Sequence, residues 1–513
     1  MSTLLIVPFA LPLLAAALGI LLRSRRGLQR AVTALLLAAL VATGVSLVVA
    51  TAGGEVVATR IGDWPAGLGI PFVADGFAAL LLTVAAAMAA VCVGYAVARD
   101  EDSHPLFHPL VAVLLAGALG AFLTGDLFNV FVTFEVMLIA SYVLLTLKGD
   151  RRAVRAGTIY VTVNLLASTL LLVGIGLVYG AAGTVELAAL HGAIGETPTA
   201  VVGASLVVVA VSIKASLVPV HGWLPRVYPQ AGPAVTALFS ALLTKAGVYV
   251  LYRLASTVFA DVEGFGTAIG VAAGITMVVG VLGAVGRGDV RGILSFHMVS
   301  QVGYLVLPLA IWTVAGVTAG IVYLLQYLAV KGALFLVAGT IETLTGTGEL
   351  KRLGGMVRTR PWLAVAFALP AFALAGLPPT SGFVGKVLLA FAAFETAHWV
   401  LGGLVVAVSI LTLLSMVKIW NGVFWGELTP AVEREPAAVT LGVPVPAGAA
   451  GNEAAPPHRL SRGRTTALVA PALVIGVLTI VVGLGAGWLV DLVGPAAEQL
   501  VDPSRYLDAI GRA

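Results

Sequence analysis

Four lysines and one glutamate lie inside long apolar stretches of this sequence. They are Glu135 in FVTFEVML, Lys214 in SIKASLVP, Lys245 in LLTKAGVY, Lys331 in LAVKGALF and Lys386 in FVGKVLLA. A charge near the centre of a bilayer costs at least about 2.5–3.5 kcal/mol on insertion scales, so ionisable residues kept there usually mark an ion or proton path. We therefore predict that these five residues carry protons.

Lysine suits such a path because its protonation responds to its surroundings. Burial favours the neutral amine, whereas a neighbouring carboxylate favours the charged form, so a lysine can load and release a proton. Glu135 is the only acidic residue that we expect deep in the apolar interior. In the competing interpretation the side chains snorkel to the interface, which fits charges near helix ends but not Lys245 and Lys331 at mid-span.

Polar side chains recur at helical spacing in two of the apolar stretches. Each set falls on one face of a helix: Tyr160, Asn164 and Ser168 in the first, and His297, Gln301 and Tyr304 in the second. These stripes could line a hydrated secondary proton path or could hydrogen-bond neighbouring helices, and both interpretations stay open. His297 is expected close to the inner end of its span, where a side chain that titrates near neutral pH suits proton entry.

Prolines interrupt two apolar stretches beside a charge. Pro219 follows Lys214, with His221 just beyond it, and the pair Pro378–Pro379 precedes Lys386. Broken helices at corresponding places in two halves are typical of inverted-repeat transporters. We expect an all-α fold with two inverted-topology repeats and two broken helices, and we add His221 to the secondary path.

The composition requires these elements to lie in a membrane. Of 513 residues, 59% are apolar and 11% are charged, against about 25% charged in an ordinary soluble domain. This composition excludes a soluble enzyme, a disordered chain and a secreted disulfide scaffold. The single cysteine, Cys92, excludes an intramolecular disulfide and a cysteine metal site. We predict a polytopic membrane protein with no cofactor and no metal site.

Apolar stretches of about 20 residues predict membrane-spanning helices. About fourteen spans are expected, at residues 4–22, 32–50, 76–97, 107–124, 127–147, 157–179, 200–222, 234–254, 267–285, 293–312, 318–341, 362–396, 400–420 and 467–490. They divide the chain into three N-terminal helices (1–106), a first repeat (107–254), a second repeat (255–420), a flexible cytoplasmic linker (421–466) and a last helix with a short external tail (467–513).

The loops alternate in charge along the chain. Of the 29 Lys and Arg residues, 21 fall in loops on one side of the predicted membrane. The other side holds four, which are Arg60, Arg253, Arg505 and Arg512. Because positive loops stay inside, we predict a multi-pass cell-membrane protein with both termini outside.

The motifs GDLFNVFVTFEVML, SIKASLVPVHGWLP, ALFSALLTKAGVYVLYR and GLPPTSGFVGK are specific. From about residue 60 to about residue 420 the chain resembles the antiporter-like proton-translocating subunits shared by respiratory complex I and the multisubunit Mrp cation/proton antiporters. The resemblance implies that Glu135 and Lys214 form an input pair, that Lys245 and Lys331 connect the two halves, and that Lys386 faces the exit.

Within that family, TFEVML and LLTKAGVY look most like the D-type Mrp subunit. Arg226 in WLPRVYPQAGP stands where complex I relatives usually have an acidic residue, which disfavours complex I. The resemblance implies a hetero-oligomeric partner set of A, B, C, E, F and G types, with protons and Na⁺ or another monovalent cation as cargo and no nucleic acid.

Two functions remain open at this point. The first is a secondary transporter subunit that uses the proton gradient to expel a monovalent cation. The second is a non-redox, proton-pumping subunit of a redox-driven complex, either an NADH-quinone oxidoreductase or a membrane hydrogenase. A purely structural membrane scaffold is disfavoured by the buried lysines.

Overall fold

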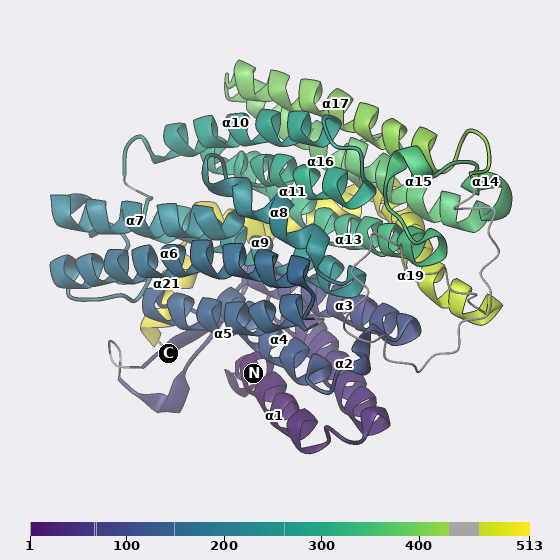
Figure 1. The fold of residues 1–513 in the computed structure, drawn as a ribbon. Helices are drawn as coiled ribbons and strands as arrows, with labels where there is room; N and C mark the ends of the chain where they lie inside the picture. The colour runs from purple at the N-terminus through teal and green to yellow at the C-terminus, as the bar shows by residue number, and fades with distance from the viewer. Residues whose placement is uncertain are drawn as a thin grey trace.

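The protein is a bundle of roughly parallel helices (Figure 1). The computed structural model describes residues 2–512 except 66, 68, 148, 261 and 430–460. Its helices, in chain order, are α1 (Val7–Leu21), α2 (Arg26–Ala50), α3 (Gly76–Arg99), α4 (Phe107–Leu123), α5 (Leu127–Thr146), α6 (Arg151–Ala182), α7 (Pro198–Ala215), α8 (Leu224–Val227), α9 (Pro233–Thr257), α10 (Phe265–Val285), α11 (Val290–Val306), α12 (Pro308–Ile311), α13 (Val314–Thr345), α14 (Met356–Thr359), α15 (Pro361–Ala375), α16 (Ser381–Glu395), α17 (Trp399–Val423), α19 (Arg462–Leu484), α20 (Ala486–Val501) and α21 (Ser504–Arg512). A short antiparallel hairpin joins β1 (Val57–Arg60) to β2 (Pro71–Ala74).

The all-α membrane fold is confirmed. Among the described residues, eleven helices are long and apolar enough to cross a membrane, and three shorter apolar helices accompany them. Each predicted span overlaps one of these helices. The number of crossings and the inverted repeats stay predictions, since length and composition alone define these helices.

Both proline-interrupted stretches are broken in the structure. α7 ends at Ala215, Ser216 takes a left-handed backbone with φ of 70°, and α8 begins at Leu224. The predicted span 362–396 is two helices, α15 and α16, separated at Gly376 with φ of 86°. A Cβ at Gly376 would lie 2.7 Å from Cδ of Lys386, so glycine meets both the backbone and the space requirements here.

Helices α9 and α13 form the centre of the bundle. Every residue of α9 is buried, and α13 packs against α9, α3, α15, α16, α19 and α20. Gly247 of α9 allows the close approach of α7, because a Cβ there would lie 2.9 Å from the backbone nitrogen of Ala215. Side chains on α9 and α13 are therefore shielded from the lipid by the surrounding helices.

The described chain ends meet at one end of the bundle. The hairpin contacts both the N-terminal turn (Ser2–Leu5) and α21, on the side of the α6–α7 connection (Figure 1). α19 ends at Leu484, earlier than the predicted limit of 490, and α20 then packs on α13 and α3. Of the predicted linker 421–466, residues 430–460 lie outside the described residues.

Candidate functional site

The first candidate cluster joins α5, α6 and α7 through a serine. Lys214 Nζ donates to Ser168 Oγ at 2.9 Å and lies 3.7 Å from Glu135 Oε1. The Ser168 hydroxyl in turn donates to the Glu135 carboxylate. This geometry gives a lysine, a hydroxyl and a carboxylate in continuous contact, so a proton can pass from the amine to the acid through the hydroxyl.

Burial differs sharply between the two charged members of this cluster. The Lys214 side chain is 3% exposed, whereas that of Glu135 is 26% exposed. Two other carboxylates, those of Asp75 and Asp102, are fully enclosed by protein, but they lie at the start of α3 and in the η4 turn (Glu101–Ser103) and not within a predicted span. Glu135 lies at the edge of the bundle, where its side chain is partly exposed at the protein surface and also contacts Lys214.

The central pair of lysines has no carboxylate partner among the described residues. On α9, Lys245 Nζ donates to the Ser240 carbonyl at 2.5 Å and to Thr244 Oγ1 at 3.1 Å, and it lies 4.3 Å from the ring centre of Tyr327. On α13, Lys331 is one turn beyond Tyr327, and no group in the described part of the chain hydrogen-bonds to its Nζ. Lys331 Nζ lies 5.5 Å from the ring centre of Phe335, one turn further along α13.

The fourth lysine sits at the second helix break. Lys386 Nζ donates to the carbonyls of Leu374 at 2.8 Å and Ala375 at 3.2 Å, the last residues of α15. The negative end of the α15 dipole and its free carbonyls favour a cation at this place. Tyr304 lies under the same amine, with its ring centre 4.8 Å away.

The predicted polar stripe of the second half lies inside the bundle. His297 is fully buried on α11 and contacts Ser415 Oγ of α17 at 2.5 Å, so it does not open onto the inner surface. The Tyr323 hydroxyl donates to Gln301 Oε1, and the Tyr304 hydroxyl donates to the Val405 carbonyl at 2.9 Å.

The first-half stripe and His221 are arranged differently. Asn164 Nδ2 donates to the Tyr160 carbonyl at 2.9 Å within α6, and the Tyr160 hydroxyl meets Ser141 Oγ at 3.0 Å. His221 is only half-buried, beyond the α7 break. In the part of the chain that the structure describes, no hydrogen bond or ion pair links Lys214 to Lys245, or Lys331 to Lys386.

Two buried ion pairs were not predicted from the sequence. Arg253, which was expected in an external loop, is buried on α9 and donates to Asp75 Oδ2 at 2.7 Å. Arg60 is also buried and contacts Glu186 at 2.8 Å. Asp75 directly precedes α3 and caps it, and Arg253 falls at i+8 from Lys245. The capping position of Asp75 and the spacing of Arg253 from Lys245 were the two features of the sequence that could have indicated an inward-facing pair.

A third ion cluster ties α2 to the η4 turn (Glu101–Ser103) and α4. Asp102 accepts from Arg30 Nε at 2.7 Å and from Arg26, and it contacts His108 Nε2 at 3.1 Å. Burial raises the pKa of Asp102, but the hydrogen bonds from His108, Arg30 and Arg26 outweigh it and hold that pKa well below its ordinary value. The carboxylate therefore stays charged.

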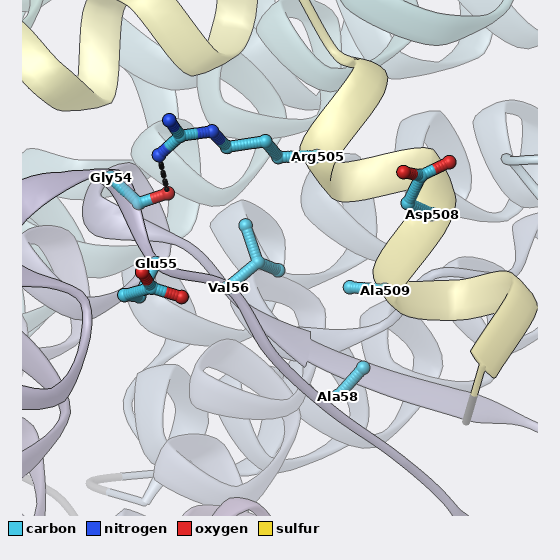
Figure 2. A pocket seen from close by; sticks show the side chains of 7 residues that line it. All are labelled: Gly54, Glu55, Val56, Ala58, Arg505, Asp508 and Ala509. Atoms are coloured by element: carbon cyan, nitrogen blue, oxygen red, sulfur yellow. Dashed lines mark hydrogen bonds between the residues drawn. The ribbon is translucent and has the colours of Figure 1, made fainter.

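A hollow of about 420 Å³ opens between β1 and α21, away from the lysines. Figure 2 shows Arg505 reaching across to Gly54, whose carbonyl it contacts at 2.9 Å, with Glu55 and Asp508 on either side. None of the predicted path residues lines it. The hollow therefore belongs to the packing of the C-terminal helix.

Comparison with known proteins identifies the family of this chain. The family model described as NADH:quinone oxidoreductase/Mrp antiporter, TM matches residues 124–414, more than half of the chain. The chain belongs to this family. The matched segment contains Glu135 and all four buried lysines.

Relatives of this family member extend the likeness over the whole chain. It is 36% identical to the D-type subunit of the Na(+)/H(+) antiporter of Alkalihalophilus pseudofirmus, over 99% of each chain. It is 33% identical to the protein of the same name from Bacillus subtilis, again over 99% of each chain. A chain of the Mrp complex from Dietzia sp. superposes with a TM-score of 0.91 at 42% identity, covering 100% of both chains.

Proposed function

We propose that this chain is the proton-translocating, D-type subunit of a multisubunit monovalent cation/proton antiporter in the cell membrane. The contact of Lys214 with Ser168 and Glu135 is the observation that carries the proposal. A salt bridge that only holds the fold together needs neither a hydroxyl between the charges nor a partly exposed acid. A proton relay uses the hydroxyl to pass the proton and the exposed acid to take it up or release it. The relatives, which are named as D-type components of Na(+)/H(+) antiporters, support Na⁺ as the exchanged cation.

In the proposed path, each lysine gains or loses a proton when the charge beside it changes. Glu135 stabilises the protonated form of Lys214, and loss of that contact releases the proton inward. Lys245 and Lys331 then exchange it between α9 and α13, since no acid among the described residues holds the charge of either amine. Lys386 delivers it at the end of α15, with Tyr304 beside the amine.

His297, Gln301, Tyr304, Asn164 and His221 form the proposed secondary path. Four of them keep a buried polar atom with no partner among the described residues: Nδ1 of His297, Nε2 of Gln301, Oδ1 of Asn164 and Nδ1 of His221. Such atoms cost free energy unless something hydrates them, and water that satisfies them would conduct protons. This supports a hydrated route beside the lysines.

The proposed orientation puts the hairpin end of the bundle outside. The positive-inside rule supports it, because the loops at the other end carry most of the Lys and Arg residues. The proposed partners are the remaining subunit types of an Mrp complex, as in the Dietzia assembly that this chain resembles. The redox-driven alternative has weaker support, since the archaeal sulfane sulfur reductase complex is related at 25% identity.

Exchange in inverted vesicles tests the proposal. The whole complex, with Glu135→Gln in this chain, should lose ΔpH-driven Na⁺ exchange while still assembling, because Lys214 can shed its proton when the counter-charge is removed. Glu135→Asp should keep part of the activity. Lys214→Ala should be as inactive as Glu135→Gln, and the double change no worse than either alone.

Glu395→Gln supplies a matched control, since Glu395 is an exposed acid elsewhere on the bundle. Normal exchange in Glu135→Gln at matched expression would remove the Lys214 cluster from the path. Exchange that does not respond to any of the four lysines would overturn the proposed function itself.

A further inference from the structure

Three arginines at the Arg-rich end of the bundle have no protein partner among the described residues. Arg152 and Arg155 lie on the first turns of α6, and Arg226 lies on α8. All three are exposed, and within the described ranges none forms a side-chain hydrogen bond or ion pair. Arg226 is also the position that departs from the complex I pattern and that the proton path does not use.

These arginines surround one cavity of about 500 Å³. It lies between the start of α6, the α8 segment and the turn from α10 to α11, and Arg287 from that turn is a fourth cation in its wall. Asp289 is the only acid among the described residues that line it. Its carboxylate accepts the Gly292 amide at 2.7 Å as the cap of α11, and its single charge is outnumbered by the four arginines of the wall.

Apart from Gln230, the remaining wall of the cavity is apolar. Ile159 lies one turn beyond Arg155 on α6, and Pro225 and Pro229 face it from the segment that follows the α7 break. A cavity with guanidinium groups at the rim and apolar side chains deeper along a spanning helix matches an amphiphile whose charged end is anionic. Guanidinium groups bind phosphate through paired hydrogen bonds. Because the rim has few carboxylates, the N–H donors of these guanidinium groups are free to bind a phosphate.

We propose that this cavity binds the phosphate headgroup of an anionic phospholipid at the inner face of the membrane. The phosphates pair with Arg152, Arg155 and Arg226, while the glycerol and upper acyl carbons lie against Ile159 and the two prolines. The bound lipid joins α6 to α8 and so braces the segment directly after the break that carries Lys214. Four cations against one engaged acid favour a headgroup with two phosphates over one with a single phosphate.

Lipid binding to the intact purified complex tests this proposal. The probes are cardiolipin, which has two phosphates, phosphatidylglycerol, which has one, and inorganic pyrophosphate, which has no acyl chain. The test variant is Arg152→Gln, Arg155→Gln and Arg226→Gln together. The control variant removes the same charge from three exposed arginines of the same end, Arg23, Arg25 and Arg358.

Delipidated wild-type complex should bind cardiolipin more tightly than phosphatidylglycerol, measured by native mass spectrometry. The test variant should bind cardiolipin at least about tenfold more weakly, since it loses several charge-assisted hydrogen bonds, and the control should change less than about twofold. Lysine at the same three positions should give an intermediate affinity, because the charge stays but the paired geometry is lost.

Equal cardiolipin affinity in wild-type and test variants would overturn the proposal, as would failure of the wild-type complex to bind either lipid. Pyrophosphate binding as tight as cardiolipin would also overturn it, because the occupant would then be a free anion and not a lipid. Exchange activity is not the readout, so the result does not depend on the proposed proton path.

Discussion

Buried charges differ in their pairing between the N-terminal end of α2 and the middle of the bundle. Asp102 is enclosed by Arg26, Arg30 and His108, each within hydrogen-bond reach. Lys245 and Lys331 are as deeply buried, yet no acid in the described part of the chain accompanies either of them. A fully satisfied charge is fixed in one protonation state, whereas an unmatched one gains by losing its proton.

This difference separates charges that hold the fold from charges that can move a proton. The Arg253–Asp75 contact belongs with Asp102, because both partners are buried and hydrogen-bonded at 2.7 Å. The Glu135–Lys214 contact is intermediate, at 3.7 Å with a hydroxyl between the partners. The degree of pairing, rather than the depth of burial, therefore distinguishes the two roles.

Removing an unmatched lysine should have the largest effect on transport and little effect on stability. Lys331→Met should abolish proton-coupled exchange while leaving the melting temperature of the complex unchanged or higher, since apolar replacement of buried charges is often neutral or stabilising by about 1–4 kcal/mol. Exchange assays and thermal unfolding of the same preparation measure both. Lys351→Met is the control, because Lys351 is exposed and should change neither. A marked fall in melting temperature for Lys331→Met would break the comparison.

Removing the fully paired acid should have the opposite result. Asp102→Asn leaves Arg26 and Arg30 with Asp100 as their remaining carboxylate. Because the two arginine side chains are 38% and 33% exposed, the cost should fall below the roughly 3–5 kcal/mol of a fully buried pair. The melting temperature of the complex should fall, while exchange per assembled complex stays close to normal. Glu395→Gln serves as the exposed control. If Asp102→Asn instead stopped exchange at unchanged stability, Asp102 would belong with the moving charges.

The intermediate cluster should give an intermediate effect. Ser168→Ala removes the hydroxyl between Lys214 and Glu135 but leaves both charges, so exchange should fall by about 2- to 10-fold, the equivalent of one hydrogen bond. Thr169→Ala changes the neighbouring exposed hydroxyl and should have no effect. Complete loss of exchange in Ser168→Ala would mean that the hydroxyl is an obligatory carrier and not an aid to contact.

The smallest expected effect is on the pH dependence of stability. The lowered pKa of Asp102 means that its stabilising contribution is fully present above its ordinary pKa of about 4 and is lost only as the pH falls below that value. The difference in melting temperature between wild type and Asp102→Asn should thus be constant from about pH 8 to about pH 5 and shrink in stronger acid. A difference that disappeared near neutral pH would contradict the assignment.

Local sequence was enough to locate most of the candidate site. Lysines within apolar stretches are conspicuous because those stretches contain few other charged residues, and the prolines after Lys214 and before Lys386 predicted both helix breaks. The spacing of Tyr160, Asn164 and Ser168 placed them on one face, and all three are buried. These features depend on near neighbours in the chain, which the sequence displays directly.

Partners from distant segments could not be predicted in the same way. Arg253 is 178 positions from Asp75, and Arg60 is 126 positions from Glu186, so no periodicity relates them. The exposure of Glu135 was misjudged for a related reason, since an apolar helix shows the same composition on its protein-facing and outward-facing sides.

Sequence by itself determined the membrane environment, the helical fold, the broken helices and the positions of the lysines within apolar stretches, because bilayer insertion constrains each stretch of chain separately. The tertiary structure alone decided which charges are matched. It placed a serine between Lys214 and Glu135, left Lys331 without a partner among the described residues, and gathered two arginines and a histidine around Asp102. Pairing depends on which helices pack together, and that depends on the shapes of whole helix faces rather than on any one segment.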